Sequence, residues 1–196
     1  MNRKKIASGV SALLNAPLIT LATFIPLILT FAASQVFPLL GVTSFFGCIL
    51  PIIGVLIMLR RGIIKDFYAT DRATRIKPFI WSIASYLIGV VILYKLHAPS
   101  AVIALMASYF VNGVVLLGIT LKWKISIHAS GISSPITALV YLLGRSMLPF
   151  FLLILPVAWA RLELKAHDKL QVTAGAIISS LLTWIQMFFY VNHLFI

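Results

Sequence analysis

"PSAVIALMASYFVNGVVLLGITL", residues 99–121, decides the fold class, because it contains no charged side chain over its whole length. A helix needs about 20 predominantly apolar residues to cross the hydrocarbon core of a bilayer. Further stretches of similar length and character lie at 17–36, 39–59, 78–95 and 171–194. We therefore predict that each of these segments forms a transmembrane helix.

The region 126–160 is also apolar, but Gly144, Arg145 and Ser146 interrupt it. One continuous helix here would be long and would bury Arg145 off-centre, so we expect two short helices that turn near Gly144. This gives seven crossings, or six if one segment is re-entrant. The predicted fold is an all-α integral membrane protein, a polytopic helical bundle of six to seven transmembrane helices that forms a single domain over residues 1–196.

Composition and charge agree with a membrane location. The chain is 61% hydrophobic and only 10% charged, whereas soluble domains carry about 25% charged residues. Its formal net charge of +12 would suggest nucleic-acid binding in a soluble protein. Beside membrane helices, however, basic residues set topology and contact anionic headgroups. We expect a multi-pass protein of the cell membrane with no nucleic-acid partner.

Three polar connections separate the apolar stretches, at 60–77, 122–134 and 161–170. Two crossings separate each connection from the next, so all three should lie on one face of the membrane, together with the N-terminus. That face holds every Lys and Arg except Lys95 and Arg145. The excess remains when the candidate site bases are left out, so the positive-inside rule predicts that this face is cytoplasmic.

The few acidic residues argue against a metal enzyme. They do not form the paired carboxylates that hold Mg²⁺ in lipid transferases, and they are Asp66, Asp71, Glu163 and Asp168. A zinc site needs several His or Cys ligands, but the single cysteine lies in an apolar run and two of the four histidines, His97 and His193, fall near the opposite face. We expect no metal and no cofactor.

What remains on the polar face is a set of basic residues and two histidines, His128 and His167. Arg and Lys donors suit phosphate oxygens, and one histidine can attack phosphorus while another protonates the leaving oxygen. Both histidines lie close to predicted helix starts, where free backbone N–H groups also favour an anion. The candidate phosphate-binding residues are Arg72, Arg75, Lys77, Lys124, Ser126 and Arg161.

These residues resemble the motifs of the type 2 phosphatidic acid phosphatase family, which shares its catalytic core with vanadium haloperoxidases. The family's third motif, S-R-x5-H-x3-D, is similar to "ARLELKAHDKLQ" at 160–171, with Gln171 at the place of the Asp. Its second motif, P-S-G-H, is similar to "ISIH" at 125–128. The first, K-x6-R-P, is weaker: Lys77 stands at the Arg, before Pro78, and Thr70 at the Lys.

The resemblance implies a role for each matching residue. His167 is expected to be the nucleophile that forms a phosphohistidine, and His128 the general acid. Gln171 is expected to orient His167, although it lacks the charge of an Asp. The phosphate is expected to contact Arg161, Ser126 and Lys77, helped by Arg72 or Arg75.

The predicted function is therefore metal-independent hydrolysis of a membrane lipid phosphate or pyrophosphate, with a polyisoprenoid lipid among the candidate substrates. Two alternatives stay open. The first is a degenerate family member that binds a phospholipid or a partner without catalysis, which Gln171 and the weak first motif favour. The second is a small transporter or assembly subunit, which predicts polar residues at mid-membrane depth; few are found beyond Asn112 and Arg145.

Overall fold

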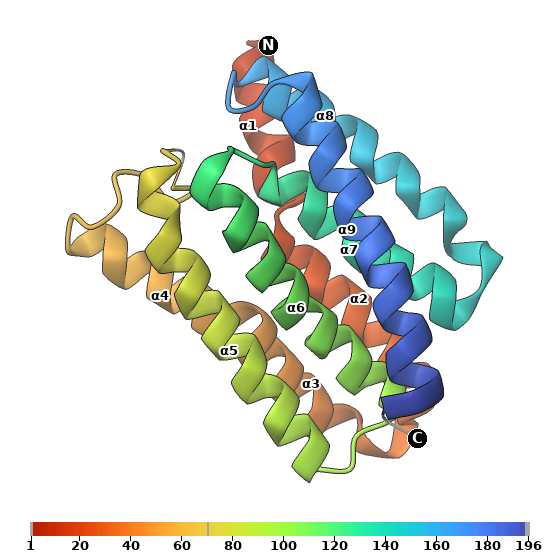
Figure 1. Ribbon diagram of the computed structural model, residues 1–196. Helices are drawn as coiled ribbons and strands as arrows, with labels where there is room; N and C mark the ends of the chain where they lie inside the picture. The colour runs from red at the N-terminus through yellow and green to blue at the C-terminus, as the bar shows by residue number, and fades with distance from the viewer. Residues whose placement is uncertain (1, 70, 195–196) are drawn as a thin grey trace.

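The computed structural model describes residues 2–69 and 71–194, and within these ranges the chain is helical with no β-strand. Figure 1 shows the helices packed side by side in one bundle. In chain order the α-helices are α1 (Arg3–Leu13), α2 (Ala16–Phe31), α3 (Val36–Ser44), α4 (Leu50–Arg60), α5 (Ile76–Lys95), α6 (Ser100–Lys122), α7 (Ile127–Leu143), α8 (Ile154–Glu163) and α9 (Lys169–Phe189). Shorter 3₁₀ or π segments are η1 (Ala33–Gln35), η2 (Phe45–Ile49), η3 (Ala73–Arg75), η4 (Arg145–Leu153) and η5 (Tyr190–Leu194).

Several of these helices are long and apolar enough to cross a membrane. The continuous helical stretches are 33–60, 73–95, 100–122, 145–163 and 169–194, and α1 with α2 adds a sixth if this pair, bent by 42°, counts as one span. Helix α7 is apolar but shorter. The prediction of a multi-pass, all-helical protein is confirmed at this level, and the count of six to seven crossings stays a prediction.

The region 126–160 contains two helical segments, as the sequence predicts. Helix α7 ends at Gly144, whose φ of 91° lies in the left-handed region that glycine tolerates at little cost. The chain then reverses through η4 into α8, and α7 packs against both.

The first two predicted spans have different boundaries in the structure. Helix α2 ends at Phe31, so the predicted span 17–36 is too long. The next helical stretch begins at Ala33 rather than at residue 39 and continues to Arg60 through the π turn η2. Pro51 lies inside this continuous stretch, directly after the π turn, and a proline there removes one backbone hydrogen bond of the helix. Apolar composition alone did not locate these boundaries.

Helix α6 is the most buried of the long spans and packs against α5, α9, α2 and α7. All its residues from Ala101 to Ser108 are buried. Further along α6, Asn112 donates to the Ser134 and Thr183 hydroxyls at 2.9 and 2.8 Å and accepts from the Gln186 amide at 2.9 Å. This polar cluster joins α6 to α7 and α9 inside the apolar bundle.

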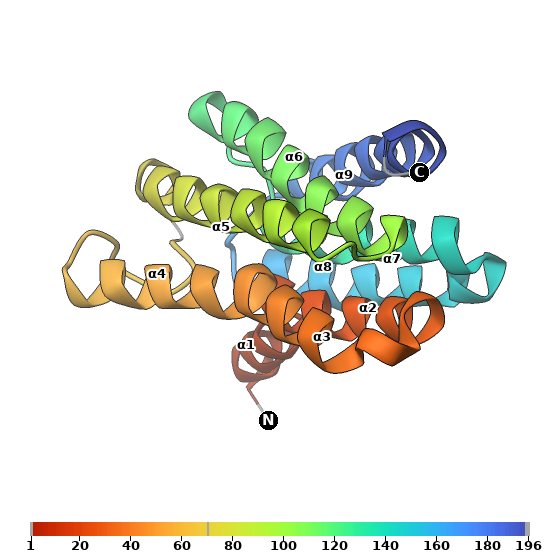
Figure 2. The same ribbon diagram turned by 90° about the horizontal axis from the view of Figure 1, so that it is seen from below.

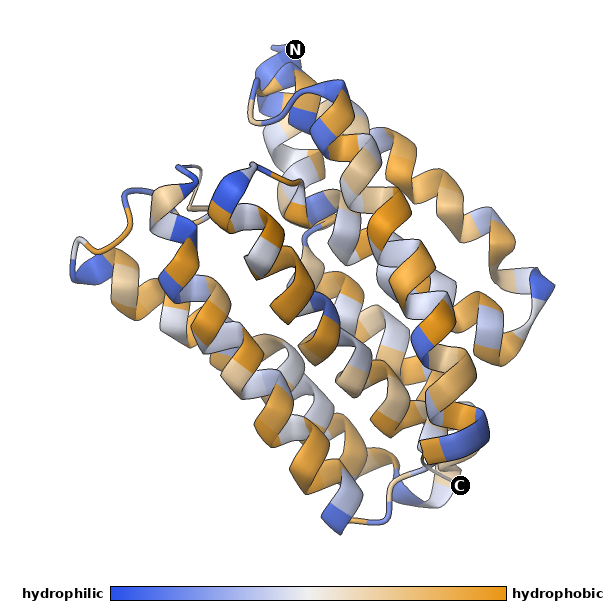
Figure 3. Ribbon diagram, in the orientation of Figure 1, coloured by the Kyte–Doolittle hydropathy of each residue, from blue (hydrophilic) through white to orange (hydrophobic). Residues whose placement is uncertain are grey.

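The three polar connections lie at one end of the bundle, with the N-terminus (Figures 1 and 2). They join α4 to α5, α6 to α7 and α8 to α9. The α5–α6 connection and the turn after α7 lie toward the other end (Figure 1). Figure 3 shows hydrophilic residues gathered around these three connections. The structure thus brings together the three segments that carry the candidate site residues.

Candidate functional site

The segment 161–171 holds His167 between the end of one helix and the start of the next. Helix α8 ends at Glu163, and Lys165 beyond it has the left-handed conformation, at a φ of 51°. The His167 N–H donates to the Arg161 carbonyl at 3.4 Å. The Ala166 N–H donates to the same carbonyl at 3.1 Å and the Lys165 N–H to the Leu162 carbonyl at 2.9 Å, which together form the hydrogen-bond pattern of a Schellman helix end. It explains why an Arg and a His six residues apart belong to one local structure.

Helix α9 begins immediately after His167 with a capping box. The Asp168 carboxylate accepts from the Gln171 backbone N–H at 2.8 Å, and the Gln171 side-chain oxygen accepts from the Asp168 N–H at 3.4 Å. Such reciprocal bonds satisfy donors that a helix start leaves free. The same Gln171 oxygen lies 2.9 Å from His167 Nδ1. Gln171 therefore has the position that the sequence predicts for the group that orients His167.

The second segment is tied to the third through the backbone. Ser126 is the N-cap of α7, and its hydroxyl accepts from the Ala129 N–H at 3.4 Å, while its own N–H donates to the Gln171 carbonyl at 3.2 Å. Ser126 is completely buried and is not among the cavity-lining residues described below. The contacts of Ser126 are thus those of a helix cap that fixes the start of α7.

The first segment supplies one arginine to the site. The Arg75 side chain is buried and donates to the Ala69 carbonyl at 2.6 Å and to the Ile125 carbonyl at 3.3 Å. Arg72 instead donates to the carbonyls of Thr120 and Leu121, at the end of α6.

Two other residues of the first motif do not join Arg75. Lys77 is exposed and does not line the cavity, and Thr70 lies outside the described residues. Of the three bases expected from this segment, Arg75 is therefore the one that the structure places with the histidines.

Arg161 is buried and is held from two sides. One guanidinium nitrogen donates to the Ser11 hydroxyl at 2.9 Å, which joins α8 to α1. The guanidinium carbon lies 5.9 Å from the centroid of the Tyr68 ring, within the range of a cation–π contact. Arg161 Nε has no hydrogen-bond partner within the described part of the chain. Leaving a buried donor unpaired costs free energy, and an anion that reached this nitrogen would satisfy it.

The charges around His167 favour its neutral form. Burial and the positive charge of Arg75 lower the pKa of His167 to about 4, with smaller contributions from Arg161 and Lys124, while the bond to Gln171 opposes this shift. Burial and the charges of Arg75 and Arg161 also lower the pKa of Lys124. The negative charges of Asp66 and Asp71 offset part of this positive charge at Arg75 and Lys124. The remaining positive excess is suited to bind an anion such as phosphate.

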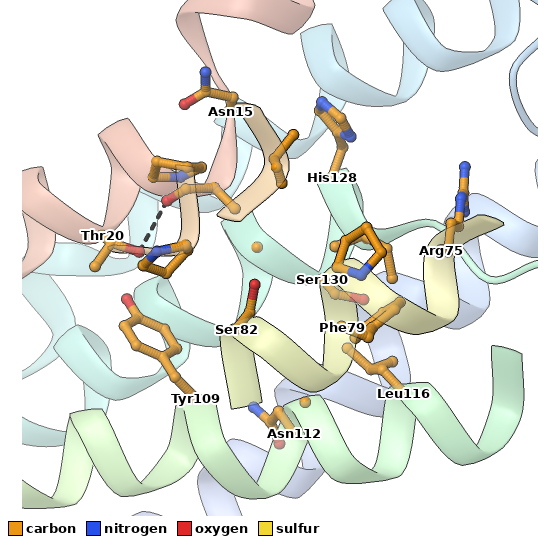
Figure 4. Close-up of a pocket in the computed structure, with 18 of the residues that line it drawn as sticks. Asn15, Thr20, Arg75, Phe79, Ser82, Tyr109, Asn112, Leu116, His128 and Ser130 are labelled. Carbon is orange, nitrogen blue, oxygen red and sulfur yellow. Dashed lines mark hydrogen bonds between the residues drawn. The ribbon is translucent and has the colours of Figure 1, made fainter. Parts of the chain in front are cut away.

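A cavity of about 240 Å³ runs into the bundle from Arg75 and His167, whereas Arg161, Lys124 and Gln171 are not among its lining residues. His128, His167, Arg75 and Tyr68 belong to its lining, and Asn112 and Tyr109 line it farther inside. In Figure 4, His128 and Arg75 lie at one end of the cavity and Asn112 at another. His128 Nε2 is buried without a hydrogen-bond partner among the described residues. The lining is mostly apolar, which fits the alkyl part of an amphipathic ligand.

The structure thus brings His128, His167 and Arg75 together in the cavity lining, with Gln171, Arg161 and Lys124 beside these residues, and leaves Ser126, Arg72 and Lys77 outside. Sequence reasoning missed two contributors. Tyr68 belongs to none of the three motifs, and Ser11 lies 150 positions away from Arg161 in the chain. The only indication of Tyr68 in the sequence was its location in a polar connection that also carries site residues.

No family model, no curated protein and no solved structure matches this chain. A function for this protein must therefore be inferred from the site itself.

Proposed function

We propose that the protein hydrolyses a membrane lipid phosphate without a metal, through a phosphohistidine on His167. The observation that carries this proposal is that His128, His167 and Arg75 together line a mostly apolar cavity, and that the positive charge of Arg161 acts on both histidines. The two histidines come from different connections of the chain, so sequence proximity does not explain their closeness. The resemblance to lipid phosphatase motifs assigns the same two residues.

In the proposed reaction, His167 is the nucleophile. With the proton of its imidazole on Nδ1, it donates to the Gln171 oxygen, and Nε2 keeps a lone pair for attack. A bond forms between Nε2 and phosphorus while the bond from phosphorus to the alcohol oxygen breaks. Protonated His128 gives its proton to that oxygen. Water then attacks the phosphohistidine, His128 takes the proton, and inorganic phosphate leaves.

The proton on His128 depends on the bound substrate. Burial and the positive charges of Arg161, His167 and Arg75 lower the pKa of His128 to about 3, so this imidazole is neutral at pH 7 without a bound anion. A phosphate monoester placed beside it adds negative charge, which favours the protonated imidazole and raises that pKa. A substrate that arrives as the monoanion also carries a proton that it can pass to His128. The acid is therefore formed in the complex rather than before it.

The arginines stabilise the charge on the transferring phosphoryl group. Guanidinium groups bind phosphate oxygens through charge-assisted hydrogen bonds, which are about twice as strong as neutral ones. Fixed positive groups of this kind act without reorganising during the reaction. The leaving alcohol is placed toward His128 and the cavity beyond it, whose mostly apolar lining favours a lipid alcohol.

A second candidate function is binding of a lipid phosphate without turnover. It is favoured by Gln171, which cannot supply the negative charge of an Asp to the attacking imidazole, and by the exposed position of Lys77. In this case the same basic residues bind the same lipid phosphate, and only the chemical step is absent.

The deciding experiment measures phosphate release by the purified protein from a panel of lipid phosphates and pyrophosphates in the presence of a chelator. We expect activity that vanadate inhibits and that His167→Ala abolishes. His97→Ala is the matched control, because His97 is exposed and remote from the cavity. Strict Mg²⁺ dependence would contradict the proposal, and binding without release by the parent protein would favour the second candidate.

A further inference from the structure

Tyr68 contacts two residues that the proposed reaction uses, the proton donor His128 and the phosphate-binding Arg161. Its ring centroid lies 5.3 Å from that of His128, with an angle of 60° between the planes. The same ring lies 5.9 Å from the Arg161 guanidinium carbon. Aromatic pairs at 4.5–7 Å and cations within about 6 Å of a ring both interact favourably. One side chain therefore contacts both α7 and α8.

The turn that carries Tyr68 is fixed by its neighbours. The Tyr68 N–H donates to the Asp66 carboxylate at 3.0 Å, and the Ala69 N–H donates to the Asp66 carbonyl at 3.0 Å. The Ala69 carbonyl accepts from Arg75 at 2.6 Å. The ring is therefore held by the segment that also holds the phosphate-binding Arg75, and its position is tied to the site.

Tyr68 makes no hydrogen bond to the two nitrogens near its ring that lack a partner in the described part of the chain. Both His128 Nε2 and Arg161 Nε are buried without a hydrogen-bond partner within the described residues. The aromatic contacts use the face or edge of each group and leave these nitrogens available. A polar side chain in place of Tyr68 would compete for them, whereas a ring restrains both groups without occupying their donors.

On the basis of the proposed function, we infer that Tyr68 is a positioning residue that holds the proton donor His128 and the phosphate-binding Arg161 at a fixed separation. The ring, not the hydroxyl, performs this role, since both contacts are made to the ring. Ser11 is the other anchor of Arg161, and its hydroxyl accepts from that guanidinium rather than contacting His128. The two anchors should therefore have different kinetic signatures.

The test compares Tyr68→Phe, Tyr68→Leu and Ser11→Ala on 4-nitrophenyl phosphate and on a long-chain alkyl phosphate. The nitrophenolate leaves without a proton, whereas the alkoxide needs one. Tyr68→Phe should act like the parent. Tyr68→Leu should lose about ten-fold more activity on the alkyl ester than on the nitrophenyl ester, a fraction of what a general acid contributes. Ser11→Ala should reduce both activities equally.

A second measurement does not require turnover. In ¹⁵N-histidine NMR, with the His128 signal assigned by its loss in His128→Gln, Tyr68→Leu should shift or broaden that signal while Tyr68→Phe and Ser11→Ala leave it in place. If the parent hydrolyses no phosphate ester, the proposed function fails and this spectrum alone decides the role of Tyr68. Equal kinetic losses on both esters, or an unchanged His128 signal in folded Tyr68→Leu, would overturn the inference.

Discussion

His167 Nδ1 lies 2.9 Å from the side-chain oxygen of Gln171, and that oxygen also accepts from the Asp168 backbone N–H at 3.4 Å. One amide therefore joins the capping of α9 to the orientation of the histidine. Since the capping box fixes the Gln171 side chain, the imidazole is held without a charged partner. The capping box at the helix start thus orients the imidazole, a role that a carboxylate performs in other enzymes with the help of its charge.

The first prediction concerns this amide. Gln171→Leu should lower turnover about ten-fold, because the imidazole loses the acceptor that fixes its tautomer. Gln171→Asp should raise turnover, because a carboxylate also stabilises the positive charge that develops during attack. In a serine-protease triad, the exchange of Asp for Asn at the comparable position costs about 10⁴ in kcat. The change here should be smaller, because Gln171 already supplies an acceptor.

The control for this prediction separates capping from catalysis. Asp168→Ala removes the other half of the capping box without removing the His167 contact, at a cost of about 0.5–2 kcal/mol in stability. Thermal unfolding and turnover are measured for each variant. If folded Gln171→Leu turned over as fast as the parent while Asp168→Ala lost stability, Gln171 would be a capping residue only.

The sequence predicted the local contact of His167 with Gln171 and the meeting of the three polar connections. It did not predict which side chains of these connections face the site. Arg161, His167 and Gln171 follow one another through a helix end and a helix start. Their relative positions are therefore determined by a short segment of the chain. Lys77 and Arg72 are about equally close in sequence to Arg75. Which of the three side chains faces the histidines is decided by tertiary packing and not by this local spacing. Ser11 reaches Arg161 because α1 packs on α8, and no local pattern encodes that contact.

The second prediction concerns pH. The pKa of His167 is lowered to about 4 in the folded protein, against about 6.5 in an unfolded chain. A nucleophilic imidazole must be neutral, so kcat/KM should fall on the acid side with an apparent pKa near 4. Lys124→Gln removes one of the charges that lower this pKa, so the acid limb should move to higher pH. The exposed Lys165→Gln is the matched control and should leave the limb in place.

The lowered pKa of His167 also makes the stability of the protein depend on pH. Between pH 6.5 and 4 the unfolded state binds a proton at this histidine and the folded state does not, so the free energy of unfolding decreases as the pH falls through this window. His167→Gln should weaken this part of the pH dependence. An unchanged profile in the variant would show that other groups cause the acid sensitivity.

The third prediction concerns Gly175, where α9 meets the start of α7. A Cβ at this position would lie 2.6 Å from the Ser126 carbonyl oxygen, which belongs to the backbone and cannot move alone. Gly175→Ala should therefore separate the two helices, destabilise the protein by about 1–3 kcal/mol and reduce activity. Gly118→Ala in α6 is the matched control, because a Cβ there would meet no atom within 4 Å; a helix usually gains stability from this exchange. Equal behaviour of the two variants would contradict the close contact.

The last prediction concerns orientation. The bundle end that carries the three polar connections should face the cytoplasm, because it retains most of the basic residues even when those of the site are set aside. Lys65→Cys and Lys95→Cys place thiols at exposed positions, the first in the α4–α5 connection and the second at the α5–α6 turn. An impermeant maleimide applied to intact cells should label the second variant and should label the first only after permeabilisation. The native Cys48 is buried, so it should add little background. Labelling of Lys65→Cys in intact cells, with Lys95→Cys protected, would reverse the orientation and place the cavity mouth on the outer face, where it would take its lipid from the outer leaflet.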